Sequence, residues 1–347
     1  RRPRSLVPLN AGLLFREPEL TKRRLSKQQL GRIAKNQGRE LGNQAQDSAA
    51  ASDARVNGVV ISHFGKQLDI EPLEGSDLVR CHQRANLPAL VTGDRVVWEA
   101  GDDGVGVVLA LGERRSVFAR PVFGGVVKPM AANIDVVLVV LAPTPMPLAS
   151  LIDRYLVAIE TLGLQPMLIL NKSDLKSQSE DPDRLEAMLE IYRGLDYPVL
   201  EVSATTGEGL DTLGESLQGV TTVLVGQSGV GKSSLVNGLG VDEALAAVGG
   251  LSTVHDKGMH TTTTSRLFHL AGFDLIDSPG IREFGLGHIS PQQVFDGFVE
   301  LRALAGQCKF RDCAHQGEPD CALQAAVDAG EIHEDRLYSY FQILDSL

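Results

Sequence analysis

The sequence feature that most constrains the fold is the stretch 226–234, which reads Gly-Gln-Ser-Gly-Val-Gly-Lys-Ser-Ser. Two glycines with four residues between them, followed by lysine and a hydroxyl residue, form the phosphate-loop pattern. The apolar run 223–225 enters the stretch as a short buried strand, and we expect residues 234–237 to leave it as a helix. Because a phosphate loop joins a buried strand to a helix, the stretch predicts an α/β domain with a mostly parallel, doubly wound sheet.

The residue types in this loop suit a nucleoside triphosphate. Glycines let the backbone curl so that successive N–H groups point at the phosphates, and the following helix adds partial positive charge. We expect Lys232 to reach the β- and γ-phosphates and Ser233 to bind Mg²⁺. The predicted nucleotide-binding residues of the loop are Gly226, Gln227, Ser228, Gly229, Val230, Gly231, Lys232, Ser233 and Ser234.

Candidate base-binding residues lie upstream of the loop, after two apolar, strand-like runs. The carboxylate of Asp174 can accept hydrogen bonds from guanine N1–H and the exocyclic amine, whereas adenine lacks that amine. We expect Asn171 to face the other edge of the base and the backbone N–H of Ala204 to meet guanine O6. Unpaired polar groups would then reject adenine strongly. The predicted base-binding residues are Asn171, Lys172, Asp174, Ser203 and Ala204.

Candidate γ-phosphate sensors lie downstream of the loop. Asp277 opens the sequence Asp-Ser-Pro-Gly, which ends at Gly280. The carboxylate is expected near the Mg²⁺ shell and the glycine N–H near the γ-phosphate. We assign Thr262, one of four consecutive threonines at 261–264, to Mg²⁺, although the run leaves the choice among them open. An ordinary GTPase begins with the phosphate loop, so this motif order predicts a circularly permuted domain.

Three cysteines and one histidine gather near the C-terminal end. Cys308, Cys313, His315 and Cys321 follow the spacing Cys-x4-Cys-x-His-x5-Cys. Four such ligands close a tetrahedral Zn²⁺ shell without an open position, so we expect a structural zinc site. Disulfides are the alternative, but three cysteines beside a histidine favour a metal. The fourth cysteine, Cys81, is expected to be a small core residue.

Permuted guanine motifs, the sequence His-Thr-Thr-Thr at 260–263, Asp-Ser-Pro-Gly and a C-terminal Cys/His cluster together resemble the bacterial ribosome small subunit-dependent GTPase A family. The resemblance covers the chain from about residue 55 to its end. It implies an assembly factor that contacts 16S rRNA and whose GTP hydrolysis is stimulated by the small (30S) ribosomal subunit.

The domain organisation follows from composition and spacing. Residues 1–46 hold eleven of the 33 Lys and Arg residues and three of the 44 acidic residues, so the net charge of −11 hides a basic end that could meet phosphates. We predict a disordered basic tail at 1–54 and a five-stranded barrel at 55–118. An oligonucleotide-binding (OB) fold and an SH3-like barrel both fit these strands, and the resemblance favours the former. The permuted GTPase domain is predicted at 119–288 and an α-rich zinc module at 289–347.

The predicted reaction is Mg²⁺-assisted hydrolysis of GTP to GDP. Ile281 occupies the position where Ras-like enzymes carry a water-orienting glutamine, so basal turnover should be slow. We expect His260 to position water once a partner orders its loop, which makes His260, Lys232 and Thr262 the catalytic candidates. An ATPase or kinase would share the phosphate loop but not Asp174. A GTP-gated RNA- or protein-binding module is the other alternative. No apolar run reaches the length of about 20 residues that spans a bilayer, so we expect a cytoplasmic protein. We also expect a monomer.

Overall fold

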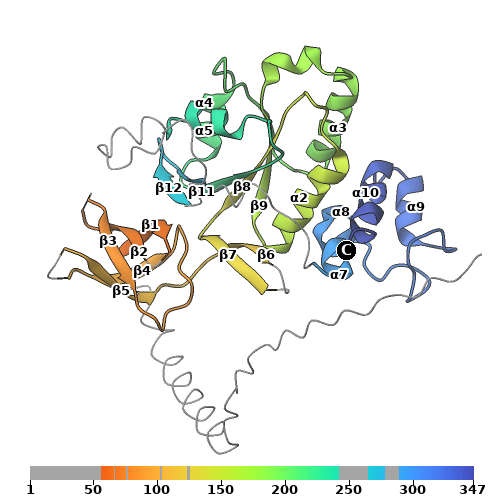
Figure 1. Ribbon diagram of the computed structural model, residues 1–347. Coiled ribbons are helices and arrows are strands. Elements are labelled where there is room, and N and C mark those ends of the chain that lie inside the picture. The colour runs from red at the N-terminus through yellow and green to blue at the C-terminus, as the bar shows by residue number, and fades with distance from the viewer. Residues whose placement is uncertain are drawn as a thin grey trace, which may run out of the picture. The chain divides into compact units, whose positions relative to one another are not determined.

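The computed structural model describes residues 56–347 except 66, 76, 102–103, 123–125, 242–264 and 278–288. Figure 1 shows three regions of secondary structure along the described chain: a small barrel, an α/β region and a group of C-terminal helices. Each region has its own cluster of buried apolar side chains, and the α/β region has one on either face of its sheet. The predicted tail at 1–54 lies outside the described residues.

The first region is a closed five-stranded barrel. Its strand order is β1-β2-β3-β5-β4, and β4 pairs back with β1 to close it. All its pairs are antiparallel except β3 with β5, which is parallel. This order and the parallel β3–β5 pair are those of the OB fold, so the SH3-like alternative is wrong. The strands are β1 (Gly58–Phe64), β2 (Gln67–Pro72), β3 (Val79–Gln83), β4 (Arg95–Glu99) and β5 (Gly106–Leu111).

The second region contains the predicted parallel sheet. β10, β9, β8, β11 and β13 lie side by side in that order, each parallel to its neighbour. Every residue of β8 is buried, as a strand covered on both faces requires. β12 adds an antiparallel strand beside β13. The strands are β8 (Val136–Leu141), β9 (Gln165–Leu170), β10 (Val199–Glu201), β11 (Thr221–Val225), β12 (Arg266–His269) and β13 (Asp274–Asp277).

Helices cover both faces of this sheet (Figure 1). α2 and α3 bury Leu156 and Leu189 on one face, and α4 and α5 bury Leu213 and Leu235 on the other. The sequence 148–162 carries apolar residues at helical spacing, and α2 buries Ile152, Leu156 and Ile159 among them, whereas Leu148 is exposed. The helices are α2 (Ala149–Thr161), α3 (Pro182–Gly194), α4 (Leu210–Ser216) and α5 (Lys232–Gly238), and a short 3-10 helix, η2 (Ser173–Gln178), follows β9.

A two-stranded hairpin that sequence reasoning missed joins the barrel to the parallel sheet. It consists of β6 (Val117–Val122) and β7 (Val126–Ala132), which pair only with each other among the named strands. The domain boundary predicted at residue 118 falls inside β6. The segment contains Pro121 and Pro129, and an isolated hairpin leaves backbone positions where proline is tolerated.

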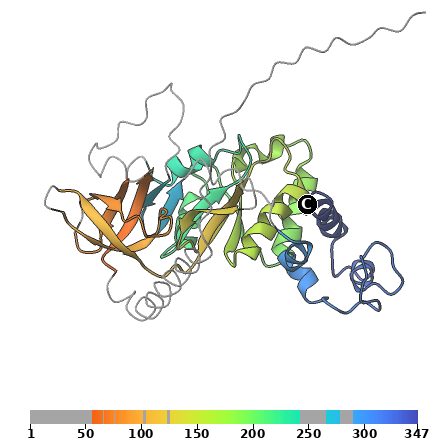
Figure 2. The ribbon, with the colours of Figure 1, turned by 60° about the horizontal axis from the view of Figure 1, so that its bottom comes forward.

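The barrel and the parallel sheet share one continuous run of strands. β12 pairs with β1 at Arg266 and Ser62, so β1 belongs both to the barrel and to the edge of the larger sheet. Figure 2 shows β12 beside the barrel strands. The Thr92 hydroxyl also donates to the carbonyl oxygen of Ser265 over 3.1 Å. The barrel therefore contacts β12 and the residue before it directly, and β13 is the next strand of the sheet.

The C-terminal region consists of short helices. Ser290 and Gln293 form a complete capping box at the start of α7, as the Ser-Pro sequence at 290–291 predicts. The last part of the chain forms two helices and not one, because Gly330 adopts a φ of 75° and ends the first of them. The helices are α7 (Pro291–Gly297), α8 (Val299–Arg302), α9 (Ala322–Asp328) and α10 (Glu334–Leu344).

Within the described ranges, none of the helices has the length and apolar character that crossing a lipid bilayer requires.

Candidate functional site

The phosphate-loop stretch connects the end of β11 to the start of α5, as predicted. Gly226 adopts a φ of 142°, and a Cβ atom there would lie 2.3 Å from the carbonyl oxygen of Val140 on β8. Gly231 adopts a φ of 91°, and a Cβ atom there would lie 2.4 Å from Nδ2 of Asn171. Both positions therefore require glycine for backbone conformation and for close approach. The loop lies at the carboxyl edge of the parallel sheet, where ligands of such folds bind.

The side chain of Lys232 lies inside the curl of this loop. Lys232 is 8% exposed. Its Nζ donates to the carbonyl oxygens of Gly226 and Gln227 over 2.6 and 2.5 Å. An ammonium group held among loop carbonyls is close to the position where it would meet the β- and γ-phosphates. Ser233 follows it in the first turn of α5.

Asn171 ties the predicted base-binding segments to the phosphate loop. The side chain is 1% exposed, its Nδ2 donates to the carbonyl oxygen of Val230 over 2.9 Å, and its Oδ1 accepts from the backbone N–H of Ala204 over 3.1 Å. Lys172, in a left-handed conformation with a φ of 61°, donates to the carbonyl oxygen of Gly229 over 2.8 Å. The sequence motifs thus meet at one sheet edge. The direct contact of Asn171 with the base stays a prediction, because in this structure its amide contacts the two loops.

Asp174 lies exposed in the first turn of η2, directly after this junction. Two residues further on, Lys176 donates to both carboxylate oxygens of Glu201 over 2.8 Å each and to Glu186 over 2.5 Å. The hydrogen bond from Lys176 holds the pKa of the Glu186 carboxyl below its usual range. Since Glu201 ends β10 just before Ser203, this network fixes the two base-binding segments relative to each other.

Sequence reasoning missed the Lys176–Glu201 network. In the sequence, Lys176 lies two residues after Asp174, and Glu201 lies two residues before Ser203. Their ion pair forms because β9 and β10 are neighbours in the sheet, which the sequence does not show.

Asp277 ends β13, next to the phosphate-loop strand. β11 and β13 pair with Val223 opposite Ile276, so Asp277 reaches the same sheet edge as the loop. This is the side of the sheet where Ser233 also lies, and a carboxylate and a hydroxyl are ligands that Mg²⁺ accepts. The predicted residues His260, Thr262 and Gly280 lie outside the described residues.

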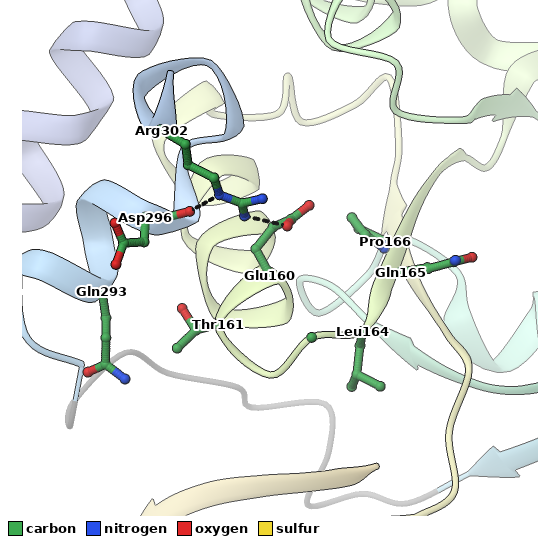
Figure 3. A pocket seen from close by; sticks show the side chains of 9 residues that line it. Glu160, Thr161, Leu164, Gln165, Pro166, Gln293, Asp296 and Arg302 are labelled. Atoms are coloured by element: carbon green, nitrogen blue, oxygen red, sulfur yellow. Dashed lines mark hydrogen bonds and ion pairs between the residues drawn. The ribbon is translucent and has the colours of Figure 1, made fainter. Parts of the chain in front are cut away.

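A cavity on the opposite edge of the sheet has no part in this site. A space of about 540 Å³ lies between the end of α2, the start of β9, and the helices α7 and α8. Figure 3 shows Arg302 reaching from α8 to the carboxylate of Glu160 on α2, a contact of 2.6 Å. Because Gln165 begins β9, this cavity lies at the amino edge of the sheet, opposite the phosphate loop.

The predicted metal ligands Cys308, Cys313, His315 and Cys321 converge in the C-terminal region, with all four ligand atoms within 4.8 Å of one another. Zinc bonds of about 2.3 Å to sulfur and about 2.1 Å to nitrogen at tetrahedral angles place these atoms about 3.6 Å apart. Nδ1 of His315 lies 3.4 Å from Sγ of Cys308 and 3.5 Å from Sγ of Cys321. The donor set and its spacing therefore fit a tetrahedral metal such as zinc.

The cluster also has outer-shell support. The backbone N–H of Ala322 donates to Sγ of Cys308 over 3.4 Å, which favours the thiolate form. His315 adopts a φ of 62° and stacks on Phe295 of α7 with ring centroids 5.9 Å apart. None of the cysteines forms a disulfide, and Cys81 is a buried core residue of the barrel, as expected.

The chain is similar in sequence to proteins of known family. The family model described as RsgA GTPase matches residues 111–287. A Pseudomonas aeruginosa (strain LESB58) protein named Small ribosomal subunit biogenesis GTPase RsgA is 51% identical over 339 residues, covering 94% of this chain and 98% of that protein. A protein of the same name from Pseudomonas savastanoi pv. phaseolicola is 50% identical over 340 residues with the same coverage.

Solved structures match as well. The crystal structure of YjeQ from Thermotoga maritima aligns with a TM-score of 0.66 at 30% identity and covers 84% of this chain and 98% of that one. The crystal structure of YloQ, described as a circularly permuted GTPase, aligns with a TM-score of 0.64 at 29% identity and covers 84% of this chain and 96% of that one.

Fold and site together define a circularly permuted P-loop GTPase that carries an N-terminal OB barrel and a C-terminal Cys/His module. The chain belongs to the RsgA GTPase family, and it is a GTP-hydrolysing enzyme. The resemblance expected from the motif order is thereby confirmed.

Proposed function

We propose that this enzyme hydrolyses GTP to GDP and phosphate with Mg²⁺, that the small ribosomal subunit stimulates the hydrolysis, and that it acts as a monomer late in small-subunit assembly through contacts with 16S rRNA. The names of the curated relatives support the small ribosomal subunit as the partner. The observation that carries the proposal is the pairing of β12 with β1 of the OB barrel. Because β12 follows the threonine run 261–264, RNA bound at the barrel would act on the strand next to the predicted switch.

We assign roles to the site residues as follows. Lys232 neutralises charge on the β- and γ-phosphates, and Asp174 selects guanine. Mg²⁺, held by Ser233 and Thr262, supplies charge neutralisation at the phosphate oxygens when it is bound. The Gly280 N–H meets the γ-phosphate, and His260 positions the attacking water in place of the residue that Ile281 cannot provide. Zn²⁺ at the Cys/His cluster is structural, because four protein ligands leave no open position.

The testing experiment is the GTP hydrolysis rate of the full chain alone, with purified small subunits, and with large subunits as the control. We expect small subunits alone to raise the rate by about two orders of magnitude or more, since ordering a catalytic group in trans can be worth about 10³–10⁵ in other GTPases. Equal rates in all three conditions would show that the small subunit does not stimulate this enzyme, whereas the GTPase activity itself would not be contradicted.

A further inference from the structure

A groove lies near the carboxyl ends of β8 and β9, on the face of the sheet that α2 and α3 cover. Its volume is about 430 Å³, and it runs between the loop 143–148, the helix α3 and the start of α10. Met146 and Leu148 from the loop and Met188 and Ile191 from α3 give it an apolar floor. Methionines make such a floor adaptable to an incoming side chain.

Leu148 occupies a position where leucine does not favour the stability of the fold. It is the N-cap residue of α2, its side chain makes no capping hydrogen bond, and it is 63% exposed. Ser, Thr, Asp or Asn at an N-cap would satisfy an N–H group that leucine leaves to water. A residue that breaks a local rule and exposes apolar surface marks a candidate functional position.

The loop that presents Leu148 is held in shape before any partner arrives. Pro143, Pro145 and Pro147 restrict its backbone, and the hydroxyl of Ser179 donates to the carbonyl oxygen of Pro143 over 3.2 Å. A groove whose walls are already ordered loses little conformational entropy on binding.

The rim of the groove is acidic. Glu180, Asp181 and Asp335 line it with exposed side chains, against the cationic Arg184 and the imidazole of His333. One oxygen of Asp181 accepts from the backbone N–H of Arg184 over 3.0 Å, and a carboxylate oxygen of Asp335 lies 3.7 Å from Nδ1 of His333. Clustered carboxylates repel phosphates, so this surface is unsuited to an RNA backbone. They attract lysine and arginine instead.

We propose that this groove docks a lysine- or arginine-rich segment of a small-subunit protein that carries a bulky apolar side chain. The apolar side chain contacts Leu148 and Met188, and its basic neighbours face Glu180, Asp181 and Asp335. The inference rests on the proposed function for its partner and goes beyond it, because it assigns the protein contact to a surface separate from the nucleotide site and from the OB barrel.

The first test places the photo-crosslinking residue p-benzoylphenylalanine at Leu148 in the full chain, bound to purified small subunits with a non-hydrolysable GTP analogue. The matched control carries it at Leu73, an apolar residue that is 51% exposed in the barrel region. We expect position 148 to crosslink a small-subunit protein through a peptide rich in lysine and arginine, and position 73 not to crosslink that peptide. A crosslink from position 148 to rRNA, to residues 1–46 of the chain itself, or to nothing while the complex forms would overturn the proposal.

The second test measures affinity for small subunits by co-sedimentation. Leu148→Ser removes the apolar anchor but supplies a good N-cap, so the variant should melt no lower than the parent protein. We expect it to bind small subunits about tenfold more weakly, since burying one leucine side chain is worth at least that factor. Glu180→Lys should also weaken binding, whereas Glu215→Lys on α4 makes the same charge change on the other face of the sheet and should not.

The results of these tests distinguish a failure of the docking groove from a failure of the proposed function. If small subunits neither bind nor stimulate the parent protein, both fail. If they bind and stimulate it and Leu148→Ser retains full affinity, only the docking groove is overturned. Basal GTP hydrolysis without ribosomes should be the same in all three variants.

Discussion

At the residue scale, Asn171 holds more of the nucleotide site together than its sequence motif suggests. Its amide links the phosphate loop to the backbone N–H of Ala204, and both loops would lose that link in Asn171→Ala. Leaving a buried donor or acceptor unpaired costs about 1–3 kcal/mol. We therefore expect GTP and GDP affinity to fall about tenfold or more in fluorescent-nucleotide titrations. Asn237→Ala, on the exposed side of α5, is the control and should bind normally.

His260 is the residue on which stimulated turnover should depend. His260→Ala is expected to retain GTP affinity, because the side chain is assigned to water and not to the nucleotide, and to lose most of the stimulation by small subunits. Parallel measurements of nucleotide affinity and stimulated rate check this. Weaker GTP binding with intact stimulation would contradict the assigned role.

At the element scale, a buried ion network fastens α10 to the GTPase domain. Arg336 on α10 is 2% exposed and pairs with Asp153 on α2 and with Glu300 on α8, which are 0% and 7% exposed. Its guanidinium lies 4.5 Å from the ring centroid of Phe298. Burial alone lowers the pKa of Arg336, but the two carboxylates outweigh it and hold the pKa above its usual value.

We expect Arg336→Met to be strongly destabilising. Removing one partner of a buried ion network leaves uncompensated charge and costs about 3–5 kcal/mol. Thermal unfolding checks this, with Arg154→Met as the control, since the contact of Arg154 with Ser346 is exposed. Replacing Asp153 and Glu300 by leucine as well should restore much of the stability, because an apolar cluster of similar volume needs no charge compensation.

Metal removal is the second test at the element scale. The cluster cysteine Cys321 is the N-cap residue of α9, and Cys308 accepts from the first N–H of that helix. A strong chelator should therefore release α9 and its surrounding loop, while the sheet strand β8 stays intact. Hydrogen exchange should show faster exchange at 308–328 and unchanged protection at β8. Cys313→Ser should reproduce the effect and Cys81→Ser should not.

At the scale of the whole molecule, His269 joins the barrel to the parallel sheet. Its Nδ1 lies 2.7 Å from Asp274 on β13 and its Nε2 lies 2.7 Å from Glu71 on β2 of the barrel. The hydrogen bond to Asp274 raises the pKa of His269 to about 9. This contact crosses the same junction as the β1–β12 pairing, through which we propose that the barrel acts on the switch.

The raised pKa predicts a pH-dependent junction. A histidine whose pKa is higher in the folded than in the unfolded chain stabilises the fold fully below the unfolded value of about 6.5, and this contribution is lost as pH rises to about 9. Because His269 is half exposed, we expect only about 1 kcal/mol or less, a melting-temperature shift of about 2 °C. His269→Gln should melt lower than the parent at pH 6 and equal to it at pH 9.5. An unchanged difference at both pH values would show that the histidine acts without its charge.

Local sequence determined most of the chemistry. The phosphate-loop stretch, the predicted base-binding tetrapeptide ending at Asp174 and the Cys/His spacing each involve neighbouring residues, so they could be recognised without a fold. The order of these motifs along the chain was enough to predict the permutation. Short apolar runs between glycine turns were enough to predict the barrel strands, and a strand buried on both faces, such as β8, appears in the sequence as a continuous apolar run.

Tertiary structure alone decided the long-range relations. The parallel pairing of β3 with β5, which distinguishes the OB barrel, joins strands separated by another strand. The shared edge of β1 and β12, the Lys176–Glu201 network and the Arg336 network each join groups far apart in sequence or in different elements. The groove beside Leu148 is likewise formed by three separate segments. Side-chain periodicity encodes which face a residue buries and not which distant partner covers it, so these contacts required the folded chain.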